Sequence, residues 1–183
     1  EVLLDQIAAN ADSISEFADV TIDDGVVQGD TGIIIRAGHF QIIGGGAMGG
    51  FNFGTEATGD IDIAASRGMN LDRGRIISRA VNSGGGSNIN IVVDGDLTLS
   101  NFSDITASTA SSGSGGNIKI TTTGDLKVVG IDWLNRSRIE TRSDYLSEGN
   151  TGSVTIEAAN VVIKDDGTIS AMTSGTGSGG SLS

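Results

Sequence analysis

Pairs of aliphatic residues separated by one polar position return at regular intervals along the chain. A small or polar residue precedes each pair, as in Gly59-Asp60-Ile61-Asp62-Ile63 and Gly116-Asn117-Ile118-Lys119-Ile120. The first aliphatic positions are spaced by 28, 28, 29, 36 and 28 residues, and they are Ile33, Ile61, Ile89, Ile118, Val154 and Leu182. Because alternate residues of a strand point to opposite faces, each phrase predicts a short β-strand with one apolar face. A sustained period of this length indicates a solenoid of stacked repeats.

Two further apolar positions recur in the repeats, and they predict a second and a third strand. The second positions are Phe40, Met69, Leu97, Leu126 and Val161, and the third are Ile76, Ile105, Ile139 and Ile169. A turn such as Asp94-Gly95-Asp96 separates the first two strands, and a Gly/Ser-rich arc closes the repeat. A repeat this short cannot bury its apolar face alone, so neighbouring repeats must stack. The predicted fold is all-β, a right-handed parallel β-helix of about six coils, with the hand expected from strand twist.

The repeats predict one β-helical segment over residues 1–183, with an irregular or capping coil at 1–30 and regular repeats at 31–183. Val20-Thr21-Ile22 resembles Val161-Val162-Ile163, which favours a coil that includes it. The apolar residues between Val2 and Ile14 fit an irregular β coil or a short helix, and we favour the coil. An enlarged coil is expected at 117–152. The chain begins at Glu1 and stops shortly after a new repeat opens, so we expect a piece of a longer protein.

Composition narrows the possible partners and chemistry. The formal net charge is −12, which argues against nucleic acid or an anionic membrane surface as a partner. There is no cysteine, which excludes disulfides and thiolate metal sites, and no apolar run approaches the roughly 18 residues needed to span a bilayer. Turn chemistry explains the aspartates at Asp94, Asp96 and Asp125, so no metal or other cofactor is predicted.

Several phrases resemble filamentous-haemagglutinin-like exoproteins of the two-partner secretion type. They are Gly115–Ile120, Gly124–Val128, Ser103–Thr109 and Ser178–Leu182, and the resemblance covers roughly Thr31 to Ser183. It implies an extracellular β-helical shaft at a bacterial surface, exported through a dedicated outer-membrane β-barrel partner. Members of this family typically act in adhesion, aggregation, matrix formation or contact-dependent toxicity. The family's secretion motif, with its Asn-Pro-Asn-Gly type turn, is absent from this sequence. We therefore expect the chain to be part of the shaft rather than of the amino-terminal head that guides secretion.

The enlarged coil carries the candidate contact residues. Its extra residues fall mainly between Val128 and Ile139, and it holds the only Trp and the only Tyr of the chain. Aromatic and Arg side chains are enriched at binding hot spots, so this coil is the predicted contact for a cell-surface glycan or protein receptor. The candidate residues are Trp133, Arg136, Arg138, Arg142 and Tyr145. The alternative is a loop that folds its aromatic back over the coil.

A second basic group consists of Arg67, Arg73, Arg75 and Arg79, which we interpret as outward charge balance with Asp104 as one partner in a neighbouring coil. The predicted function is that of a non-enzymatic secreted rod, used in adhesion or as a structural spacer. One alternative is a polysaccharide-active β-helix enzyme, which needs two carboxylates within about 10 Å in a groove. Another is a self-assembling extracellular filament subunit that associates end to end.

Overall fold

The computed structural model describes residues 17–29, 31–131, 134 and 136–183. The prediction for Val2–Ile14 therefore lies outside the described residues, as does most of the capping coil expected at 1–30. Within the described ranges the chain forms strands, turns and arcs without any helix. It follows that no described helix could cross a membrane.

Three parallel sheets make up the fold, and each collects one strand from every repeat. The first sheet contains β3 (Ile33–Ala37), β6 (Ile61–Ala65), β9 (Ile89–Val93), β12 (Ile118–Thr122) and β15 (Val154–Glu157). The second sheet contains β1 (Val20–Asp23), β4 (Phe40–Ile43), β7 (Met69–Asp72), β10 (Leu97–Ser100), β13 (Asp125–Val129) and β16 (Asn160–Lys164). The third sheet contains β2 (Val26–Gln28), β5 (Ala47–Asn52), β8 (Arg75–Ala80), β11 (Asp104–Thr109), β14 (Arg138–Ser143) and β17 (Thr168–Thr173).

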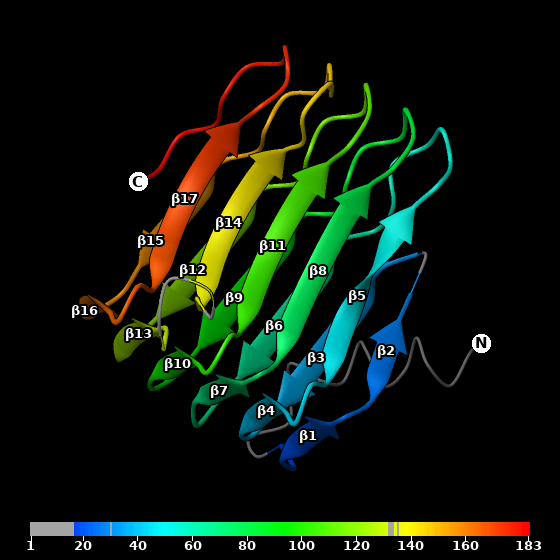
Figure 1. Cartoon of the computed structure of the whole chain (residues 1–183). Coiled ribbons are helices and arrows are strands. Elements are labelled where there is room, and N and C mark those ends of the chain that lie inside the picture. Colours follow the sequence, from blue (N-terminus) through cyan, green and yellow to red (C-terminus); the bar gives the residue numbers. More distant parts are fainter. Residues whose placement is uncertain (1–16, 30, 132–133, 135) are drawn as a thin grey trace, which may run out of the picture.

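The chain visits the three sheets in turn, and this winding confirms the predicted parallel β-helix. In Figure 1 it rises through the third sheet in front and returns behind through the first and second sheets as it advances towards the C-terminus, which is a right-handed path. Over the described residues there are five coils with all three strands. They are preceded by β1 and β2, and they are followed by a bridge between Val154 and Leu182.

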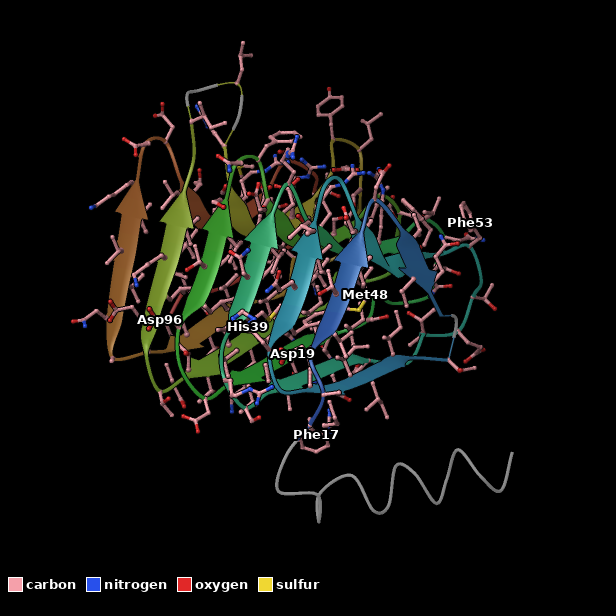
Figure 2. The ribbon with its side chains drawn as sticks, turned by 90° about the horizontal axis from the view of Figure 1, so that it is seen from below. Phe17, Asp19, His39, Met48, Phe53 and Asp96 are labelled. Carbon is pink, nitrogen blue, oxygen red and sulfur yellow. The ribbon has the colours of Figure 1, made fainter. Side chains whose placement is uncertain are left out.

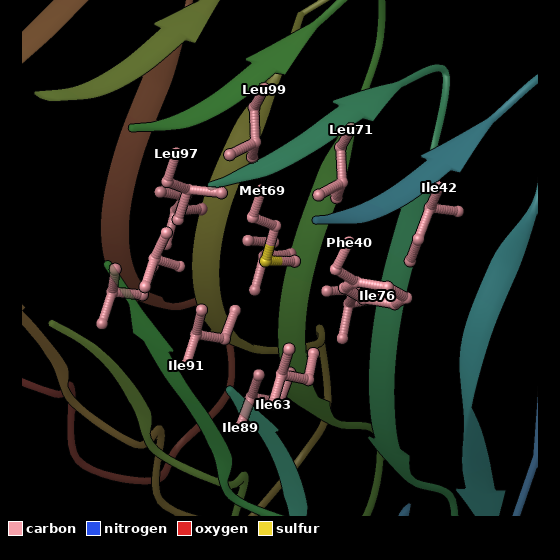
Figure 3. Close-up of a cluster of buried hydrophobic side chains, with 14 of the residues drawn as sticks. Phe40, Ile42, Ile63, Met69, Leu71, Ile76, Ile89, Ile91, Leu97 and Leu99 are labelled. Carbon is pink, nitrogen blue, oxygen red and sulfur yellow. The ribbon is translucent and has the colours of Figure 1, made fainter. Parts of the chain in front are cut away.

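The register of the coils is the one that the aliphatic columns predict. Ile61 pairs with Ile89, Ile89 with Ile118, and Ile118 with Val154, and none of these side chains is more than 2% exposed. The second and third columns stack in the same way, through Met69 and Leu97 and through Ile76 and Ile105. Figure 3 shows Ile89, Met69, Leu97 and Ile76 of these columns lying in the core between the sheets. Burial of one continuous apolar column is what holds repeats together that have no core of their own.

Two features depart from the regular pattern. Val161 is in register with Leu126 but is 48% exposed, because β16 is an edge strand with one neighbour. In the enlarged coil, residues 130–137 connect the second sheet to the third. One coil earlier, residues 101–103 alone make the same connection. Its closing arc, at 144–153, is also longer than the arc at 110–117.

A ladder of polar side chains runs along the entry to the first sheet. Asp60 Oδ1 accepts from the Asn88 backbone amide at 3.0 Å, and Asn88 Oδ1 accepts from the Asn117 amide at 2.9 Å. In the next two coils, Asn117 Oδ1 accepts from the Ser153 amide at 2.8 Å, and Ser153 Oγ accepts from the Ser181 amide at 3.1 Å. Each coil thus supplies an acceptor to the backbone of the coil that follows.

Candidate functional site

The connections between the second and third sheets form a corner at which the backbone is repeatedly left-handed; we call it the left-handed corner. Its residues with φ between 47° and 103° are Asp24, Gly44, Gly45, Arg73, Asn101, Phe102, Asp165 and Asp166. Gly, Asn and Asp tolerate this conformation, whereas other side chains rarely adopt it. Arg73 and Phe102 are therefore exceptions at this corner, and each costs on the order of 1 kcal/mol of backbone strain.

Both exceptional residues line a groove of about 620 Å³, which we call the corner groove. Its lining residues come from four successive coils, and they are Gly45, Asp72, Arg73, Arg75, Asn101, Phe102 and Ile131. Ile131 belongs to the long 130–137 connection, so the enlarged coil does contribute to this surface. Phe102 is 42% exposed and Ile131 is 57% exposed, which leaves apolar surface open beside the polar groups.

The polar groups of the corner groove are only partly neutralised. Asn101 Nδ2 donates to Asp72 Oδ1 at 3.0 Å, and Arg73 Nε lies 3.8 Å from the same oxygen. The Arg75 side chain forms neither an ion pair nor a hydrogen bond with any described residue. Among the described lining residues, two guanidinium groups thus stand against one carboxylate. The Asp24 carboxylate borders the groove beside Gly45, so the two guanidinium groups are concentrated at the end that Arg73 and Arg75 line.

The predicted contact residues do not gather at one place. Trp133 lies outside the described residues, and Arg136 is exposed just before β14. At the start of β14, Arg138 Nε and Nη2 donate to the two carboxylate oxygens of Asp104 at 2.9 and 3.1 Å. This bidentate hydrogen bonding raises the pKa of the Arg138 guanidinium. Arg138 is thus engaged within the protein, and Asp104, with its side chain only 9% exposed, is nearly buried beneath it.

The other two candidates lie at the far end of β14. Arg142 Nε lies 3.0 Å from Asp144 Oδ1, without hydrogen-bond geometry, and Arg79 donates to Asp144 Oδ2 at 2.5 Å. Tyr145 is 79% exposed in the arc that follows. The length of β14 therefore separates Arg136 and Arg138 from Arg142 and Tyr145.

The four arginines of the second basic group do not lie together either. Arg67 pairs with Asp19 at 2.7 Å and Arg79 pairs with Asp144, as outward charge balance predicts. Arg73 and Arg75 instead belong to the corner groove. Asp104 lies in register between Arg75 and Arg138, but its ion pair is with Arg138 alone. The sequence named the two arginines of the groove but missed Asn101, Phe102 and Ile131 as their neighbours.

The turns between the first and second sheets bring carboxylates together, as their spacing predicts. Asp19, His39 and Asp96 lie along this side of the molecule (Figure 2). Asp96 accepts from Lys127 Nζ at 2.7 Å and from the Asp125 amide at 2.9 Å, and Lys127 also lies 3.6 Å from Asp125. Thr123 Oγ1 donates to Asp94 at 2.8 Å. No group of three metal-ligating side chains occurs among the residues that the structure places.

Replacing Lys127 by methionine is expected to raise the pKa of Asp96 towards its ordinary value of 3.8. Hydrogen bonding from Lys127 and from the Asp125 amide lowers the pKa of Asp96, and the hydrogen bond to Asp96 raises the pKa of Lys127 above 10.5. The lowered pKa of Asp96 stabilises the fold above its unfolded-state pKa, and this contribution is lost as the pH falls through the folded-state pKa. The raised pKa of Lys127 stabilises the fold below its unfolded-state pKa, and this contribution is lost as the pH rises through the folded-state pKa.

A carbon-13 NMR titration of the Asp96 carboxyl measures the shift directly. Lys119→Met is the matched control, because Lys119 is an exposed cation on the first sheet. An Asp96 pKa that is the same in the wild type and in Lys127→Met would contradict the assignment. Because both groups are exposed, added salt should reduce the difference.

Comparisons of the chain with protein-family models, with curated proteins and with solved structures give no match. The functional argument therefore depends on the fold and on the surfaces described above.

Proposed function

We propose that the chain is a stretch of a secreted, non-enzymatic bacterial surface rod that acts in adhesion or as a structural spacer. The observation that carries this proposal is the unbroken, in-register stacking of coils around one core. Such a solenoid holds its lateral surfaces in fixed positions and extends by about 4.8 Å for each added coil. The resemblance to filamentous-haemagglutinin-like exoproteins supports the same assignment, including export through an outer-membrane β-barrel partner.

The composition of the corner groove favours binding over hydrolysis. Asp72 is the one carboxylate among the lining residues that the structure describes, and Asn101 and Arg73 already contact it. Acid–base hydrolysis of a glycosidic bond uses two carboxyl groups that face each other across the substrate. The carboxylates at Asp96 and Asp125 lie in a different corner, where Lys127 engages them.

Beads coated with the folded chain are expected to be retained on epithelial cells or on bacterial cells above the level of uncoated beads. Beads coated with the same chain after denaturation are the matched control, because they carry the same charge and composition. In parallel, the soluble chain should release no reducing ends or unsaturated products from a panel of polysaccharides. Product release would contradict the proposal in favour of the enzyme alternative, and light scattering of the soluble chain would detect self-assembly into filaments.

A further inference from the structure

We propose that the corner groove is a lateral binding site for an acidic polysaccharide, which lies along the axis of the rod. This inference rests on the proposed function, because it assigns a ligand class to the rod's outer surface. It is carried by three independent observations at one place: an open groove, incompletely neutralised arginines, and an aromatic residue held in an unfavourable backbone conformation.

The charges of the groove select an anionic ligand. Arg75 has no partner among the described residues, and Arg73 has only the distant contact with Asp72, while 67% of the Arg73 side chain is exposed. A guanidinium group presents paired N–H donors that match a carboxylate or a sulfate. The acidic surface of the chain, including Asp24 beside Gly45, would repel an anion, so binding of an anionic group is expected at the end of the groove that Arg73 and Arg75 line.

The backbone conformation sets Phe102 apart from a simple turn residue. At the equivalent turns, Asp24, Gly45 and Asp165 take left-handed backbone without a large side chain. Phe102 takes φ of 70° and still leaves 42% of its surface open to solvent. Strain that is retained at an exposed position indicates a role for the side chain itself. A flat apolar ring beside arginines and the Asn101 amide matches a sugar ring, which carries both an apolar face and hydroxyl groups.

The position of the groove favours a polysaccharide over an acidic peptide. Extended peptides bind most readily by adding a strand to an open sheet edge. Here β7 lies between β4 and β10, and β8 lies between β5 and β11, so their backbone groups are already paired. The groove instead crosses successive turns, from Gly45 to Ile131, in the direction in which the coils stack. A long ligand recognised by side chains can follow this path.

The test measures binding of defined probes to the soluble chain by isothermal titration calorimetry. The acidic probes are an oligogalacturonate, which carries carboxylates, and a heparin-derived oligosaccharide, which carries sulfates as well. A malto-oligosaccharide of equal length serves as the neutral probe, and poly-L-glutamate serves as the acidic peptide. We expect saturable binding of at least one acidic oligosaccharide, weakened by added salt, and at least tenfold weaker binding of the neutral sugar and the peptide.

Phe102→Asn and Arg73→Asn are the decisive variants, because asparagine tolerates the left-handed conformation better than phenylalanine or arginine does. Each is expected to leave the melting temperature unchanged or higher, and to weaken binding of the acidic oligosaccharide at least tenfold. Arg75→Gln should weaken binding as well. Lys119→Gln removes a cation outside the groove and is expected to leave binding unchanged.

Three results would overturn the assignment: unchanged affinity in all three groove variants, tighter binding of poly-L-glutamate, or no binding of either acidic probe. Repeating the bead assay with Phe102→Asn separates this inference from the proposed function. If the wild-type chain binds neither acidic probe but its beads are retained, the groove site is rejected and adhesion through another surface stays in place. If Phe102→Asn loses both glycan binding and bead retention, the groove is supported as the adhesive site.

Discussion

Gly116→Ala is expected to lower the free energy of unfolding by about 3 kcal/mol, at the upper end of the cost of overpacking. A Cβ at Gly116 would overlap the carbonyl oxygen of Ser87 in the preceding coil and would lie 2.5 Å from its carbonyl carbon. The obstruction is backbone that is fixed by pairing on both sides, so it cannot move aside as a flexible side chain would. Urea unfolding followed by circular dichroism measures the change.

The neighbouring glycine provides the control. A Cβ at Gly115 would find its nearest atoms at 3.6 and 3.7 Å, which is ordinary van der Waals contact. Gly115→Ala should therefore change the unfolding free energy by no more than about 1 kcal/mol, and the lower entropy of the unfolded chain favours a gain. Equal losses for the two variants would mean that close approach of the coils is not the reason for glycine at this position.

Arg138→Met is expected to cost about 2–3 kcal/mol, somewhat less than the roughly 3–5 kcal/mol for breaking a fully buried pair, because Arg138 is partly exposed. The variant leaves the Asp104 carboxylate, with its side chain 9% exposed, without its bidentate donor. Most of the cost is the burial of an unpaired charge, rather than the loss of attraction itself. Urea unfolding again provides the measurement.

Two further variants test this explanation. Arg75→Gln removes the cation in register on the other side of Asp104 and should change stability by less than about 0.5 kcal/mol, since Arg75 makes no ion pair. Adding Asp104→Leu to Arg138→Met should recover much of the loss, because the buried charge is then absent. A double variant no more stable than Arg138→Met would contradict this account.

The fold could be predicted from the sequence because three aliphatic columns recur with nearly constant spacing. Shifting a coil by one residue would turn Ile118 and Ile120 from the core to the solvent, so the register of each strand is strongly determined. The enlarged coil keeps the same strand register, because its extra residues lie in the connections at 130–137 and 144–153 rather than in the strands. Stacking could therefore be inferred without any structural information.

The corner groove could not be predicted in the same way. Arg73, Phe102 and Ile131 belong to three different coils, and they meet only because the turns of these coils superpose. The sequence signal was the replacement of Gly, Asn or Asp at turn positions, but its meaning depends on φ angles that the sequence does not give. The ion pairs of Arg138 and Arg142 depend likewise on which acidic side chain lies within reach, and the sequence does not show this.

The polar ladder from Asp60 to Ser181 gives the stack a chemical direction. Along it, a side-chain oxygen of one coil accepts from the backbone amide of the coil that comes later in the chain. The earlier winding therefore presents side-chain acceptors to the later one, and its backbone amides donate to carbonyl groups of the later one, as Ile61 does to Asn88. The two faces of a winding therefore differ chemically at this ladder, and two stacks could continue it only if the C-terminal face of one met the N-terminal face of the other.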